Sequence, residues 1–133
     1  MNRFAFVALL TLSPLSSPLT AFADASSECA LDLGSQVEIA DCVAATEIKA
    51  TRAMEMMLEF AKSSAQELDE MTGRVVALPA LEASQSAWEA YRDAQCDYVG
   101  AGFGGGSGTG IAIRSCKVEL TRARTKEIAS QLR

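Results

Sequence analysis

Residues 81–116 read LEASQSAWEAYRDAQCDYVGAGFGGGSGTGIAIRSC, and this stretch decides the fold of the chain. Seven of the eleven residues at positions 100–110 are glycine, and each glycine costs about 1 kcal/mol in a helix relative to alanine. Helix-forming residues lie on both sides of this tract, and Cys96 and Cys116 flank it. The stretch therefore predicts two antiparallel helices joined by a glycine loop and held together by a disulfide.

Further helices are predicted on either side of this hairpin. Ser35 and Glu38 form a capping box before a long helical pattern that ends at Gly73. Nine residues define its apolar stripe: Val37, Ala40, Ala44, Ile48, Met54, Leu58, Ala61, Ala65 and Leu68. A single helix of this extent would be roughly 55 Å long, so we expect a bend or a break near residues 62–64. The segment before it, residues 24–34, is expected to be irregular.

The two helices of the hairpin are predicted at residues 79–99 and 111–132. Pro79 suits a first helical turn. The inward face of the first of these helices is expected to consist of Leu81, Ser84, Trp88, Tyr91, Gln95 and Tyr98. No alternating strand pattern is present. The fold class predicted is all-α, a small antiparallel bundle of three to four helices stapled by two disulfides.

The first 23 residues have the features of a cleaved signal peptide. Arg3 precedes an apolar run, and Ala21-Phe22-Ala23 forms an A-x-A cleavage site. Cleavage would leave one domain, residues 24–133, in the periplasm or outside the cell. The apolar run is interrupted by prolines and serines and is too short for stable membrane insertion.

Four cysteines in a short exported chain indicate two disulfides. Three pairings are possible, and we favour Cys29–Cys42 with Cys96–Cys116, because each bond then closes a short local loop. A zinc site is disfavoured, since the spacings contain no C-x-x-C pair.

The predicted mature chain is acidic, with 17 acidic and 11 basic side chains. This balance argues against a nucleic-acid partner, which requires a basic surface, and is compatible with a basic protein. The charge is uneven, because residues 100–133 carry six bases and only two acids.

The chain contains no histidine, which removes the usual general base and the commonest metal ligand. We therefore predict no catalytic residue, no cofactor and no metal, and no enzymatic activity. The G-x-G-x-x-G match at positions 100–105 is expected by chance in a glycine tract that no strand precedes.

Two segments are candidates for partner binding. Trp88, Tyr91 and Arg92 either pack structurally, with Arg92 paired to an acid such as Glu89 or Asp93, or form an exposed cluster of the kind found at interface hot spots. The glycine tract either is a plain connector or protrudes into a partner's cleft, with Phe103 at its apolar tip beside Gly104 and Gly105.

These same segments resemble the lysozyme inhibitor LprI-like domain family of exported bacterial proteins. The resemblance rests on Q-x-x-W-x-x-Y-R-x-x-x-C at positions 85–96, a glycine-containing loop, and Cys116-x3-Leu120-Thr121-x2-Arg124-x2-Glu127-Ile128. Cys29 and Cys42 fit the family's first cysteine pair. Where family members carry Asp-x-x-Leu-Asn-x-x-Tyr, this chain reads TRAMEMML at positions 51–58.

The resemblance implies a helical, disulfide-bonded protein of the cell envelope that inhibits a lysozyme-type muramidase by binding it. A basic lysozyme would suit the acidic chain as a partner. The alternative is a structural or accessory envelope protein that binds an unrelated protein. The sequence leaves the oligomeric state open.

Overall fold

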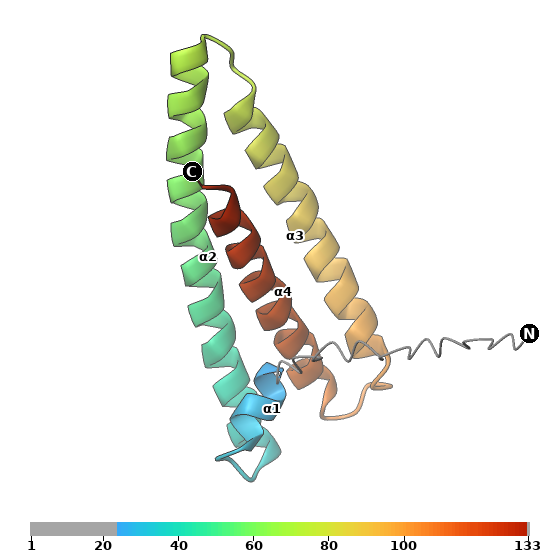
Figure 1. Ribbon diagram of the computed structural model, residues 1–133. Coiled ribbons are helices and arrows are strands. Elements are labelled where there is room, and N and C mark those ends of the chain that lie inside the picture. The colour runs from blue at the N-terminus through green and yellow to red at the C-terminus, as the bar shows by residue number, and fades with distance from the viewer. Residues whose placement is uncertain (1–23, 133) are drawn as a thin grey trace, which may run out of the picture.

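In the computed structural model, which describes residues 24–132, the chain forms four α-helices and no strand (Figure 1). They are α1 (Ala25–Ala30), α2 (Gln36–Thr72), α3 (Ala77–Ala101) and α4 (Thr109–Gln131). The predicted signal peptide lies outside the described residues. Helices α2 and α3 meet at a turn and diverge from it, and α4 lies between them and contacts both. The all-α prediction is confirmed.

Both predicted disulfides are present, Cys29–Cys42 and Cys96–Cys116. The first links α1 to α2, and the second links α3 to α4. None of the described helices is long and apolar enough to cross a membrane.

Helix α2 is continuous from Gln36 to Thr72, so it has no break near residues 62–64. The capping box is present, with the Ser35 hydroxyl accepting from the Glu38 N–H at 3.2 Å and the Glu38 carboxylate accepting from the Ser35 N–H at 3.1 Å. Gly73 ends the helix in the left-handed conformation, with a φ of 64°. No glycine or proline interrupts the residues between, and these are the usual causes of a kink.

Asp69 closes the turn between α2 and α3. Its carboxylate accepts hydrogen bonds from the backbone N–H groups of Val76, Ala77 and Leu78, at 3.0, 2.7 and 3.1 Å. These N–H groups belong to the start of α3, which has no side-chain cap of its own. The bonds lower the pKa of Asp69 below its ordinary value, the bond from Ala77 contributing most. A residue of one helix thereby caps the next.

The helices of the hairpin extend further into the glycine tract than predicted, since α3 ends at Ala101 and α4 begins at Thr109. Gly100 is buried, and a Cβ there would overlap the side chain of Ile113. This glycine is therefore needed for the close approach of α3 and α4. Gly104 and Gly105, with φ values of 62° and 80°, allow the chain to reverse.

The core is small and consists of two apolar clusters that both include α1. One contains Ala25, Ala50 and Val118, and the other is built on Cys29, Val43 and Ile111. The expectation that residues 24–34 are irregular is therefore wrong in part, because six of them form a helix that the core buries on one side.

Several residues predicted to face inward are exposed. On α2, Val37 and Ile48 are exposed, and the buried positions include Val43, Ala50, Met54 and Ala61. On α3, Tyr91 and Tyr98 are exposed, and the buried positions are Gln85, Cys96 and Gly100. The predicted stripe of α2 is therefore confirmed at Met54 and Ala61 and wrong nearer the N-terminus of the helix. On α3 the inward positions are small or polar residues, which an apolar pattern does not detect.

Candidate protein-binding site

The aromatic–arginine segment of α3 packs against α4. The Arg92 guanidinium lies 5.2 Å from the centroid of the Trp88 ring, and the Arg124 guanidinium of α4 lies 6.0 Å from it. A cation over an aromatic face within about 6 Å is attracted by the ring quadrupole. Trp88 is therefore engaged by two cations from the protein itself.

Arg124 is the charged centre of this packing and is only 6% exposed. It donates to the side-chain oxygen of Gln85 at 3.2 Å, to the Ser84 hydroxyl at 3.0 Å and to the Glu127 carboxylate at 2.9 Å. Gln85 also donates to Glu89 at 3.0 Å. Burying a guanidinium is tolerated when its donors are satisfied, and here α3 and α4 together satisfy them.

Arg92 pairs with Asp93, one of the two acids expected for it, at 2.9 Å. Lys117 of α4 approaches the same carboxylate at 3.3 Å. Partial burial raises the pKa of Asp93, but the hydrogen bonds and charges of Arg92 and Lys117 outweigh it and lower the pKa overall. Trp88 and Arg92 are thus held within the protein, whereas Tyr91, at 55% exposure, is open to a partner.

The remaining candidate residues lie at the opposite end of α3 from the turn. We define the loop end as Asp24, α1, residues 31–35, the first two turns of α2, and the glycine loop at residues 102–108. Phe103 is half exposed, and its ring packs over Gly108. Backbone hydrogen bonds such as Phe103 N–H to Gly100 C=O at 3.0 Å and Thr109 N–H to Gly106 C=O at 3.0 Å hold the loop in a series of turns.

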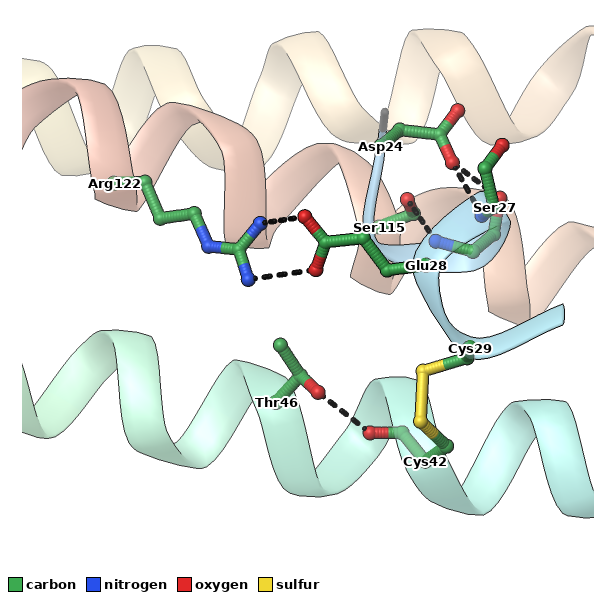
Figure 2. The surroundings of a disulfide bond; sticks show 9 residues. Asp24, Ser27, Glu28, Cys29, Cys42, Thr46, Ser115 and Arg122 are labelled. Carbon is green, nitrogen blue, oxygen red and sulfur yellow. Dashed lines mark hydrogen bonds and ion pairs between the residues drawn. A yellow bond between two sulfur atoms is a disulfide. The ribbon is translucent and has the colours of Figure 1, made fainter. Parts of the chain in front are cut away.

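Three kinds of contact anchor α1 at the loop end (Figure 2). The Cys29–Cys42 disulfide attaches it to α2, with Cα atoms 5.9 Å apart. The Arg122 guanidinium donates to both oxygens of Glu28 at 2.9 Å, which lowers the pKa of Glu28. The buried Ser115 hydroxyl accepts from the Ser26 N–H at 3.0 Å.

Asp24 begins α1 in the role of its N-cap. Its carboxylate accepts from the Ser27 N–H at 2.8 Å and from the Ser26 hydroxyl at 2.7 Å. These hydrogen bonds, chiefly that of the Ser26 hydroxyl, lower the pKa of Asp24. The carboxylate therefore stays charged at neutral pH.

Between these elements lies an open groove of about 270 Å³, which we call the loop-end groove. Helix α1, the start of α2, the glycine loop and the start of α4 form its walls. Its lining residues are Ser26, Ser27, Ala30, Gln36, Ile39, Phe103, Gly108, Ile111 and Ala112. Phe103 and Ile39 come from segments more than 60 positions apart in the chain, and the groove brings them together with no charged residue in its lining.

Acidic residues are concentrated in the segment that contains α1 and the start of α2, which form one side of this groove. Residues 24–48 contain six acids and no base. Two of the acids are neutralised by α4, since Glu28 pairs with Arg122 at 2.9 Å and Glu47 with Arg114 at 2.7 Å. The other four make no ion pair within the described residues: Asp24, Asp32, Glu38 and Asp41. The loop end therefore combines an apolar groove with four acids that form no ion pair within the described residues.

Sequence reasoning missed two parts of this arrangement, helix α1 and the role of Arg124. A sequence signal for α1 exists, because aspartate is a common N-cap residue. The N–H of Ser27, three residues after Asp24, is at the position that donates to such a cap. No signal marked Arg124 as buried. Among the described residues, no group of three or more acidic or cysteine side chains could hold a metal ion.

Comparisons with known proteins relate this arrangement to a family. The sequence profile described as Lysozyme inhibitor LprI matches residues 26–128. An uncharacterised protein of Rhizobium meliloti (strain 1021) is 46% identical over 52 residues, which make up 39% of this chain and 37% of that protein. The match thus spans little more than a third of that relative's length. No solved structure matches the chain. Because the profile extends from α1 to the last turns of α4 and includes all four cysteines, the chain belongs to the LprI lysozyme-inhibitor family.

Proposed function

We propose that this protein is an exported inhibitor of a lysozyme-type muramidase, that it acts by binding rather than by catalysis, and that the loop end is its contact surface. Membership of an inhibitor family supports a protein partner. Two disulfides support an oxidising compartment such as the periplasm or the cell exterior.

The observation that carries the choice of surface is that the apolar groove and four acids without an ion pair occur at the same end of the molecule. A basic enzyme would be steered toward the four unpaired acids of the loop end, since complementary charge raises the rate of association. Phe103 offers an apolar side chain that is already positioned by Gly108. A preformed contact of this kind avoids part of the ordering cost of binding.

The test measures binding and inhibition with the mature protein, residues 24–133, and a basic C-type lysozyme. Titration calorimetry gives the dissociation constant, and the rate of lysis of a peptidoglycan suspension gives the inhibition. We expect Phe103→Ser to weaken binding at least tenfold, because the apolar contact is lost. Asp41→Lys should mainly slow association, with a smaller effect at high salt.

Glu55→Lys is the matched control, because it makes the same charge change on an exposed part of α2 away from the loop end. Equal effects of Asp41→Lys and Glu55→Lys would contradict a localised contact surface. Absence of both binding and inhibition by the unaltered protein would reject lysozyme as its target and favour an accessory role with another envelope protein.

A further inference from the structure

A second apolar groove lies at the other end of the molecule. Helix α4 ends at Gln131, short of the turn that joins α2 to α3 (Figure 1). A groove of about 570 Å³ remains between α2, α3 and the C-terminal end of α4, and we call it the tip groove. Eleven residues line it: Ala61, Ser64, Ala65, Glu67, Leu68, Met71, Ala77, Leu81, Ile128, Gln131 and Leu132.

The tip groove is apolar at its base, and none of residues 24–132 fills it. Ile128 and Ala61 are buried at 2% and 7% exposure, whereas Leu68 and Met71 at its border are 48% and 79% exposed. The α2 wall runs from residue 61 to residue 71, which corresponds to about 15 Å of helix, or nearly three turns. A groove of this length matches one face of a short helix, which presents apolar side chains at three- and four-residue steps.

Contacts within the protein connect the two walls of the tip groove. Asp69 accepts three N–H groups from the start of α3, so the angle at which α2 and α3 leave the turn is set by hydrogen bonds. The side chain of Lys62 bridges Glu59 of α2 and Glu82 of α3 at 3.9 and 4.0 Å. The two walls are therefore held apart without a filling side chain between them.

The charge around the tip groove is negative. Glu67 lines it directly. Residues 58–89 and 124–133 carry seven acids and five bases. Neither α2 nor α4 has a basic residue in its last turn, where a cation would offset the negative end of the helix dipole. A second copy of this acidic chain or an anionic lipid surface would be repelled, whereas a cationic segment would be attracted.

We infer that the tip groove binds a basic amphipathic helix of a partner protein. The apolar face of that helix lies against Ala65, Leu68 and Leu81, and its lysine or arginine side chains face Glu67 and the C-terminal ends of α2 and α4. This site is separate from the loop end and does not depend on lysozyme being the target there.

The probe is a fluorescein-labelled 15-residue peptide of leucine and lysine, with leucine at i, i+3, i+4 and i+7, measured by fluorescence anisotropy against the mature protein. Two peptides serve as controls. One has the same composition in an order that spreads the leucines around the helix, and the other has glutamate in place of lysine. We expect the amphipathic lysine peptide to bind at least tenfold more tightly than either control.

Two variants locate the binding. Ala65→Trp fills the groove and should weaken binding at least tenfold. Leu68→Lys changes an exposed side chain and places a cation on the wall, so it should weaken binding similarly without disturbing the core. Leu31→Gln, which alters a residue 82% exposed at the loop end, is the control and should leave the affinity unchanged.

The inference is overturned if the reordered peptide binds as tightly as the amphipathic one, since charge alone would then explain the interaction. It is also overturned if Leu68→Lys binds the amphipathic peptide with unaltered affinity. Circular dichroism on each variant confirms that the helices are intact. The lysozyme assay is read separately, because its outcome depends on the loop end.

Discussion

A single carboxylate, that of Asp69, replaces the cap that α3 lacks. Its charge is stabilised by three backbone N–H groups, which is why its pKa is lowered. A carboxylate whose pKa is lower in the folded state stabilises the fold at pH values above its unfolded pKa of about 3.9. That contribution is lost as the pH falls through the folded pKa.

We therefore expect Asp69→Asn to lower the melting temperature by several degrees at pH 7. The difference from the unaltered protein should shrink as the pH falls below the unfolded pKa and through the lowered folded pKa, because Asp69 itself then becomes protonated. Thermal melts followed by circular dichroism across this pH range measure both effects. Asp32→Asn, an exposed acid without a capping role, is the control. A difference that stays constant with pH would show that the charge of Asp69 does not contribute.

Arg124 joins α3 to α4 through Gln85, and its removal leaves the buried amide oxygen without that donor. We expect Arg124→Met to destabilise the protein by about 1–3 kcal/mol, the usual cost of an unsatisfied buried polar group. Urea unfolding followed by Trp88 fluorescence measures this, since Trp88 is the only tryptophan. Arg52→Met, an exposed arginine on α2, should change stability by less than about 0.5 kcal/mol. Equal effects of the two substitutions would contradict the role given to Arg124.

Helix α1 has six residues, and isolated helices of that length are not stable in water. It persists because the core and the Cys29–Cys42 disulfide hold it. We expect the double variant Cys29→Ser/Cys42→Ser to lose about 3 kcal/mol of stability. Amide hydrogen exchange should then show α1 open, with α3 and the middle of α4 still protected. Equal loss of protection in all four helices would show that α1 is not a separately tethered element.

The long helices were predictable because their boundaries carry chemical signals. The capping box at Ser35 and Glu38 and the left-handed Gly73 both lie where the sequence placed them. The faces of the helices were less predictable. Small and polar residues such as Ala50, Gln85 and Gly100 occupy the inward positions, and burial of these depends on neighbours from other helices. The sequence analysis also did not predict that α2 is continuous, because a helix of 37 residues is long for a domain of this size.

At the scale of the whole molecule, charge is distributed so that the two ends of the chain attract each other. Acids of α1 and α2 pair with arginines of α4, as in Glu28 with Arg122 and Glu47 with Arg114. The sequence showed this division into an acidic and a basic part, but not which acids would remain unpaired. The choice of the candidate site depends on which acids remain unpaired. The tertiary contacts of α4 determine this, because they neutralise Glu28 and Glu47.

The placement of the two disulfides also determines how the backbone is divided into covalently closed segments. One bond closes residues 29–42 and the other closes residues 96–116, so neither spans residues 73–76 at the tip. A single cut after the exposed Arg74 would yield two fragments with no covalent bond between them, one containing α1 and α2 and the other α3 and α4. Their association would then depend on concentration, because the turn that keeps them at a high effective concentration would be gone. The protein therefore consists of two disulfide-linked helix pairs connected by the turn at the tip. A protease acting at this turn would separate the acidic residues of α1 and α2 from the helices that carry the family signature.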